Sequence, residues 1–125
     1  MTGEGRLLSH LREILGEEGF VLLCQELGGM RLYVPYKFRD DNDIVQAIGH
    51  DRAEQLSRAL APATIRVPLA RRERALYYRG QGLSNPRIAR RLGMTENGVQ
   101  KLFDREESLP DRPDSGRSAG QLSLF

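Results

Sequence analysis

The sequence predicts a mainly helical protein, in which two repeated helix-helix-strand units share a small two-stranded antiparallel sheet and precede a helix-turn-helix. Three observations lead to this fold class: a helix-turn-helix pattern over residues 82–103, an internal repeat in the first half of the chain, and two short alternating segments that each end at a proline. We expect three regions, which are a helical repeat or dimerisation region (1–68), a helix-turn-helix region (69–107) and a flexible tail (108–125).

The segment GLSNPRIARRLGMTENGVQKLF, residues 82–103, has the apolar spacing of two short helices. Apolar residues fall on one face of each helix, namely Leu83, Ile88, Ala89 and Leu92 in the first, and Val99 and Leu102 in the second. Gly93 lies between them, where the chain must turn sharply and a residue without Cβ is favoured. Ser84 or Asn85 is suited to cap the first helix, and Thr95 the second. The pattern is typical of a unit that lays its second helix in the major groove of DNA.

Residues 14–35 and 47–68 form an internal repeat with an offset of 33 residues. The aligned pairs are Leu11 with Ile44, Gly16 with Gly49, Leu23 with Leu56, Leu27 with Leu60, Leu32 with Ile65, Val34 with Val67 and Pro35 with Pro68. Each copy predicts a helix, a glycine corner, a second helix, a turn and a strand, with the strands at 30–34 and 63–67. A repeat of this size cannot bury its apolar face alone, so the two copies should pack about a pseudo-twofold axis. The packed repeat is either a scaffold or, in addition, a dimer surface.

Residues 69–80 predict a helix that supports the helix-turn-helix. Three of its side chains should face inward, which are Ala75, Leu76 and Tyr78, and four should face solvent, which are Arg71, Arg72, Arg74 and Arg79. The distribution of charge agrees with a surface that faces phosphates. Residues 1–61 hold seven Lys and Arg against ten Asp and Glu, whereas residues 62–109 hold ten against five.

The segments GGMRLYVP (28–35) and YRGQGLSNPRIARRLGMTENGVQKLF (78–103) together resemble the Mor transcription activator family of Mu-like phages. The resemblance covers roughly residues 10–105. It implies a helical dimerisation region with a short strand, followed by a helix-turn-helix that binds promoter DNA. The partners it implies are double-stranded DNA, RNA polymerase and a second copy of the chain.

The second helix of the motif should present its first turns to base edges. The candidates for base contact are Glu96, Asn97, Gln100 and Lys101, whose side chains match donors and acceptors of the major groove. The candidates for phosphate contact are Arg71, Arg74, Ser84, Arg87, Arg90 and Arg91. The alternative for the arginines is a solvated helix face. Gly98, inside the second helix, either permits a close backbone approach or is a tolerated weakness.

Residues 108–120 are rich in Pro, Gly and Ser and predict a disordered linker. The five residues after it, Gln121, Leu122, Ser123, Leu124 and Phe125, resemble the pentapeptide by which bacterial replication and repair proteins bind the sliding clamp. A short extended peptide of this kind docks in a surface groove. The sequence therefore offers a second hypothesis, in which the protein is an adaptor or inhibitor that acts through the clamp. The alternative is that these apolar residues fold back onto the core or onto a second protomer.

Other classes of function find little support in the composition. Cys24 is the only cysteine, so an intrachain disulfide is impossible, and no apolar run approaches the ~20 residues that span a bilayer. His10 and His50 are the only histidines, and neither has a cysteine or carboxylate at the spacing of metal ligands. We therefore expect no enzyme, no metal or other cofactor, no membrane association, and a cytoplasmic location in a bacterial host.

Overall fold

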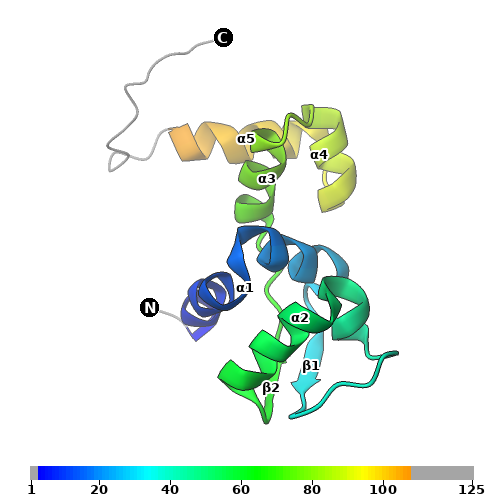
Figure 1. Ribbon diagram of the computed structural model, residues 1–125. Helices are drawn as coiled ribbons and strands as arrows, with labels where there is room; N and C mark the ends of the chain where they lie inside the picture. Colours follow the sequence, from blue (N-terminus) through cyan, green and yellow to red (C-terminus); the bar gives the residue numbers. More distant parts are fainter. Residues whose placement is uncertain (1–2, 108–125) are drawn as a thin grey trace.

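The computed structural model describes residues 3–107 and confirms the expected fold class. The elements in chain order are α1 (Gly3–Leu27), β1 (Arg31–Val34), α2 (Asp43–Leu60), β2 (Ala63–Arg66), α3 (Arg71–Gly80), α4 (Asn85–Leu92) and α5 (Glu96–Glu107). In Figure 1 the first four elements form a lower unit, and α3, α4 and α5 form an upper unit that stands on α1. Among the described residues, no helix combines the length and the apolar character that crossing a membrane requires.

The two long helices each bend at a glycine, as the repeat predicts. Gly16 in α1 has φ 76° and ψ 169°, and Gly49 in α2 has φ 87° and ψ 164°. Backbone angles of this kind are accessible almost only to glycine, because a Cβ atom would clash with the adjacent peptide. The glycine corners expected from the sequence are therefore confirmed, and each one changes the direction of its helix.

The strands β1 and β2 pair antiparallel, with Leu32 directly opposite Ile65. One face of the pair is buried through Leu32, Val34 and Ile65, while the other carries exposed Arg31, Tyr33, Thr64 and Arg66. This alternation is what a two-stranded sheet with one covered face requires. The observed strands are one residue shorter than expected, at Met30 and at Val67, although Val67 still donates a 2.9 Å hydrogen bond to the carbonyl oxygen of Met30.

The core of the lower unit is built from equivalent positions of the two repeats. Buried residues at matching positions include Leu11 and Ile44, Leu15 and Ile48, Phe20 and Ala53, Leu23 and Leu56, and Val34 and Val67. The helix that opens the second repeat is capped by Asn42, whose side-chain oxygen accepts a 2.7 Å hydrogen bond from the backbone nitrogen of Ile44. The two copies therefore bury their apolar faces against each other, as a repeat of this size requires.

Candidate nucleic-acid interface

Helices α4 and α5 form the expected helix-turn-helix. Gly93 ends α4 in the left-handed conformation, with φ 69°, and its backbone nitrogen donates to the carbonyl oxygen of Arg90. Thr95 caps α5 as predicted, because its hydroxyl oxygen accepts a 2.9 Å hydrogen bond from the backbone nitrogen of Gly98. Ser84 holds the N-cap position of α4, but its side chain makes no capping hydrogen bond. The core between the helices consists of Ile88, Ala89, Leu92, Val99 and Phe103, all buried.

Arg74 does not face solvent, so the expectation that it contacts phosphate is wrong. Its side chain is 4% exposed and lies inside the upper unit. Its guanidinium group donates to the hydroxyl of Tyr78 at 3.3 Å, to the carbonyl oxygen of Leu69 at 3.3 Å and to the carbonyl oxygen of Arg91 at 2.9 Å. The planar guanidinium satisfies three acceptors on different segments at once, and Arg74 therefore fixes α3 against the end of α4.

A second set of polar contacts links all three helices of the upper unit. Arg79 donates a 3.0 Å hydrogen bond to the side-chain oxygen of Asn85, and Asn85 donates one of 3.1 Å to Gln100 on α5. Gln100 in turn donates to a carboxylate oxygen of Asp104 at 3.0 Å. The guanidinium carbon of Arg79 also lies 3.8 Å from the ring centroid of Phe103, a close cation–π contact. Arg79 is exposed, as expected, but its role is to hold α5 in place.

The four candidates for base contact are all exposed on the first half of α5: Glu96, Asn97, Gln100 and Lys101. Within residues 3–107, the side chains of Asn97 and Lys101 make no hydrogen bond or ion pair, so both are available to a ligand. Gln100 is already engaged by Asn85 and Asp104, and reading a base would require it to exchange those contacts. Within this described part of the chain, Asn97 and Lys101 therefore present a free amide group and a free ammonium group on the exposed surface of α5.

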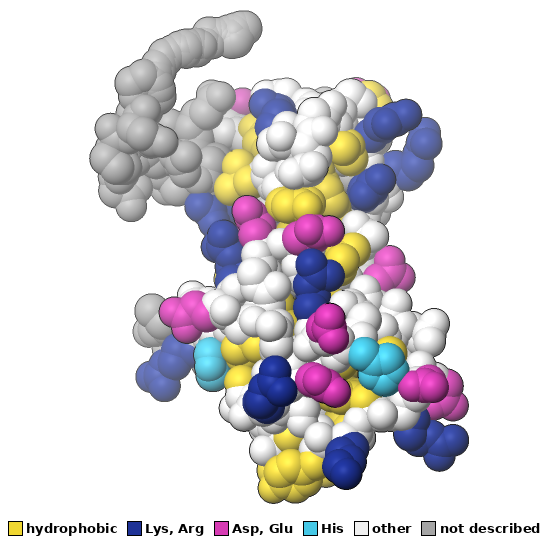
Figure 2. Space-filling view, viewed as in Figure 1, with side chains coloured by type: hydrophobic (Ala, Val, Ile, Leu, Met, Phe, Trp, Pro, Cys, Tyr) yellow, Lys and Arg dark blue, Asp and Glu magenta, His cyan; other side chains and the backbone are white. Residues whose placement is uncertain are grey.

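Two of the three basic side chains of α4, Arg87 and Arg90, form one exposed surface, which we call the α4 basic face. These residues are three apart and so lie on the same side of the helix. Figure 2 shows Lys and Arg side chains gathered over this part of the upper unit. Ser84 is exposed at the start of the same helix. Arg71 is exposed as well, but it begins α3 at the end nearest α1 and so stands apart from this face.

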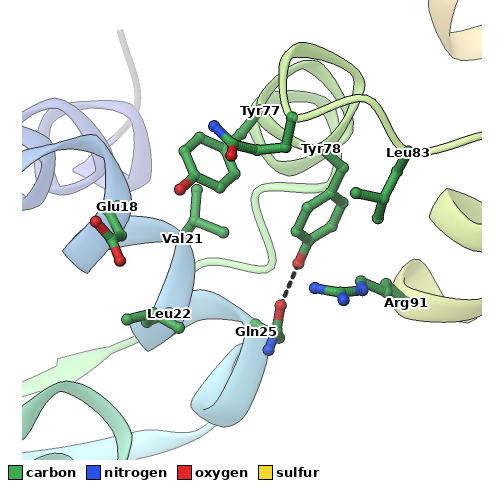
Figure 3. Close-up of a pocket in the computed structure, with 9 residues that line it drawn as sticks. Glu18, Val21, Leu22, Gln25, Tyr77, Tyr78, Leu83 and Arg91 are labelled. Carbon is green, nitrogen blue, oxygen red and sulfur yellow. Dashed lines mark hydrogen bonds between the residues drawn. The ribbon is translucent and has the colours of Figure 1, made fainter.

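Arg91 is exposed but turns toward the junction between the two units. Its guanidinium carbon lies 5.4 Å from the ring centroid of Tyr78. It also lines a cavity of about 350 Å³ between α1 and the upper unit, together with Glu18, Val21, Leu22, Gln25, Tyr77, Tyr78, Gln81 and Leu83. Figure 3 shows this cavity, with Glu18 and Arg91 on opposite sides and the hydrogen bond from Tyr78 to Gln25 between them. Arg91 would have to swing outward to contact a phosphate.

The acidic residues counted in the second half of the sequence lie mostly on α5. α5 contains Lys101 and Arg105 against four acidic residues, Glu96, Asp104, Glu106 and Glu107. By contrast, α4 contains three arginines and no acidic residue. Three of the four acidic residues lie in the second half of α5, away from the turns that would enter a groove. The excess of positive charge in this pair of helices therefore lies on α4.

Gly98 lies close to its own helical turn and not to another helix backbone. A Cβ atom at this position would meet the terminal carbon of Met94 at 3.0 Å and the hydroxyl oxygen of Thr95 at 3.3 Å. The glycine leaves room for the side chains of Met94 and Thr95, and no backbone of α4 lies near its Cβ position.

The histidines, the acidic residues and the C-terminal pentapeptide are the other candidates that the sequence raised. Among residues 3–107, no group of three or more His, Cys, Asp or Glu side chains is placed to hold a metal ion. His50 lies 2.7 Å from a carboxylate oxygen of Asp40, a pairing of two exposed side chains that the sequence spacing did not suggest. The pentapeptide Gln121, Leu122, Ser123, Leu124 and Phe125 lies outside the described residues.

Comparison with known proteins found no family model, no curated protein and no solved structure that matches this chain. The resemblance to the Mor family therefore rests on the segments quoted from the sequence.

Proposed function

We propose that this chain is a sequence-specific DNA-binding transcription regulator of phage type, similar to Mor activators, that lays α5 in the major groove. One observation carries the proposal. Asn97 and Lys101 project without partners from the first turns of α5, beside an α4 basic face that has no acidic residue on its helix. Unpaired polar groups on a recognition helix and cations on the helix before it are the two parts of a helix-turn-helix reader.

The α4 basic face and the exposed polar residues of α5 would make different contributions to DNA binding. Arg87 and Arg90 would neutralise phosphates and set the register of the protein on the duplex, which supplies affinity without sequence information. Asn97 would hold adenine through two hydrogen bonds, and Lys101 would donate to guanine. The contacts of Arg74 and Arg79 would keep α5 in a fixed position relative to α4, so that both parts engage together.

The test is selection of bound duplexes from a random DNA pool, followed by gel retardation of the selected sequence. Asn97→Ala and Lys101→Ala should each weaken binding to the selected site by about 1–3 kcal/mol and leave binding to unrelated DNA nearly unchanged. Arg87→Ala and Arg90→Ala should weaken binding to both DNAs. Each should also reduce by about 0.9 the magnitude of the slope of log affinity against log salt.

A matched control is Gln55→Ala, an exposed change on α2 that lies outside the proposed surface and should alter neither affinity nor slope. If no sequence is enriched, or if the Asn97 and Lys101 variants bind the selected site as tightly as the natural chain, the proposed reading of bases is wrong.

A second candidate function is an adaptor or inhibitor of the bacterial sliding clamp. The observation that favours it is the match of Gln121, Leu122, Ser123, Leu124 and Phe125 to all five positions of the clamp-binding pentapeptide. The test is binding of the full chain, and of a chain that lacks residues 121–125, to purified clamp. Micromolar binding that disappears with the deletion supports this function, and absence of binding by both chains contradicts it. DNA binding should be unchanged by the deletion.

A further inference from the structure

The two repeats are related by a pseudo-twofold axis that passes through contacts between equivalent residues. With the offset of 33 residues, Leu32 corresponds to Ile65, and these two residues face each other directly in the sheet. Gly19 corresponds to Arg52, and a Cβ atom at Gly19 would lie 2.7 Å from the side chain of Arg52. A residue that contacts its own equivalent lies on a twofold axis, which is the signature of an isologous dimer interface. Here that interface lies inside one chain.

Local geometry is repeated on both sides of this axis. The glycine corners at Gly16 and Gly49 differ by only 11° in φ (76° and 87°) and 5° in ψ (169° and 164°). The backbone nitrogen of Gly28 donates to the carbonyl oxygen of Cys24 at 2.9 Å, and the equivalent bond from Ala61 to Ser57 is also 2.9 Å. Both repeats thus keep the same helix end and the same corner, as two subunits of a dimer would.

The surface on which the upper unit docks is present in only one repeat. On α1, Val21 is buried and Leu22 is half-buried, and both line the junction with α3 and α4. Their equivalents on α2 are Glu54 and Gln55, which are exposed. Gln25, which accepts the hydrogen bond from Tyr78, corresponds to exposed Arg58. The second repeat has therefore lost the apolar patch that would receive a second helix-turn-helix.

We infer that the two repeats of one chain replace a two-chain dimer, so that a single chain binds a single, non-palindromic DNA half-site as a monomer. The inference rests on the proposed DNA-binding function and specifies the kind of DNA site, which is a single half-site without an inverted repeat. It also decides between the alternatives that the sequence left open for the repeat, since the duplication satisfies internally the pairing for which a second copy was expected.

The physical reason is that the symmetry of a DNA-binding protein determines the symmetry of the DNA site it recognises. Dimeric helix-turn-helix proteins read palindromes because their twofold axis relates two recognition helices, which enter major grooves about one turn apart. In this chain the axis relates α1 and β1 to α2 and β2, and within residues 3–107 one recognition helix is present, α5. No symmetry element of the fold thus calls for a second half-site.

The experiment combines the mass of the protein in solution with the stoichiometry of its DNA complex. Light scattering of the full chain at micromolar concentration should give the mass of one chain, 14.1 kDa. Titration of the selected duplex well above its Kd should reach equivalence at one chain per duplex, and the selected sequence should have no inverted repeat. A duplex with two copies of the site should bind two chains independently. The Asn97→Ala variant should bind the selected site roughly 5- to 150-fold more weakly and keep the monomeric mass.

Three other outcomes are distinguishable. A selected palindrome that binds two chains cooperatively overturns the inference and leaves the proposed function intact. A two-chain mass in the absence of DNA overturns the inference in the same way. Failure to enrich any DNA sequence overturns the proposed function and, with it, the half-site inference.

Discussion

The hydroxyl group of Tyr78 donates a 2.6 Å hydrogen bond to the side-chain oxygen of Gln25, which ties α3 to α1. The same hydroxyl oxygen accepts the hydrogen bond from the Nε atom of Arg74 at 3.3 Å. Tyr78 is 2% exposed and Gln25 is half-buried, so both hydrogen bonds lie at the edge of the cavity between the two units. One buried tyrosine therefore connects the repeat unit to the arginine that organises the helix-turn-helix.

Tyr78→Phe should destabilise the fold by about 1–2 kcal/mol, because it leaves the buried Arg74 Nε without its acceptor and removes the hydrogen bond to the half-buried Gln25 side chain. The measurement is the free energy of unfolding in urea. Tyr36→Phe removes the same hydroxyl from a side chain that is 71% exposed, and should change stability by less than about 0.5 kcal/mol. Equal stabilities of the two variants would show that the Tyr78 hydroxyl has no structural role.

Arg74→Lys should cost about 2 kcal/mol, although it keeps the charge. A lysine ammonium cannot reach the Tyr78 hydroxyl and the carbonyl oxygens of Leu69 and Arg91 together, so at least one buried acceptor loses its donor. The control is Arg71→Lys, an exposed change three residues earlier, which should leave the urea midpoint unchanged. If Arg71→Lys destabilised the chain and Arg74→Lys did not, the structural role assigned to the Arg74 guanidinium would be wrong.

Gly16→Ala and Gly49→Ala should each destabilise the chain by about 1–3 kcal/mol, and by similar amounts. No atom lies within 4 Å of the Cβ position at either glycine, so the loss would come from the backbone conformation and not from crowding. Gly80→Ala is the matched control, since its Cβ position is equally open and Gly80 has no positive φ. It should be neutral or slightly stabilising. Thermal or urea unfolding separates these cases.

The repeat and the helix-turn-helix could be predicted because both depend on local periodicity. The sequence alone shows the alternating segments that end at Pro35 and Pro68. It also shows that Gly16 and Gly49 occupy equivalent positions of the repeat. These patterns predict strands and helix corners because each one reflects the backbone conformation of its own short segment. The register with Leu32 opposite Ile65 then follows from the twofold packing of two equal units.

The burial of Arg74 could not be predicted, because a charged residue on an amphipathic helix is normally exposed. Its acceptors come from Leu69, Tyr78 and Arg91, and the last is 17 residues away in the chain. They converge only after α4 packs on α3. The same holds for Arg79 over Phe103, which depends on the angle at which α5 crosses α3. Side-chain contacts of this kind depend on how the helices pack in three dimensions. The spacing of residues along the sequence therefore does not predict them.

Cys24 provides a test of burial that is independent of these hydrogen bonds. Its side chain is 1% exposed, and burial raises the pKa of its thiol from 9.0 to about 12, with Arg74 opposing and Glu73 adding to the shift. At pH 8 the folded chain should therefore hold a thiolate fraction about a thousandfold smaller than the unfolded chain. Iodoacetamide should modify the native chain far more slowly than the chain in urea.

The same pKa shift predicts how stability changes with pH. The contribution of Cys24 is fully present below about pH 9, where the thiol is protonated in both states, and it is lost as the pH rises toward 12. The reason is that the unfolded chain releases its proton first, which stabilises the unfolded state. Urea midpoints between pH 8 and about pH 10.5 should fall more steeply for the natural chain than for Cys24→Ala, in which every other titrating group is the same. Parallel curves for the two chains would mean that the thiol reaches solvent in the folded state.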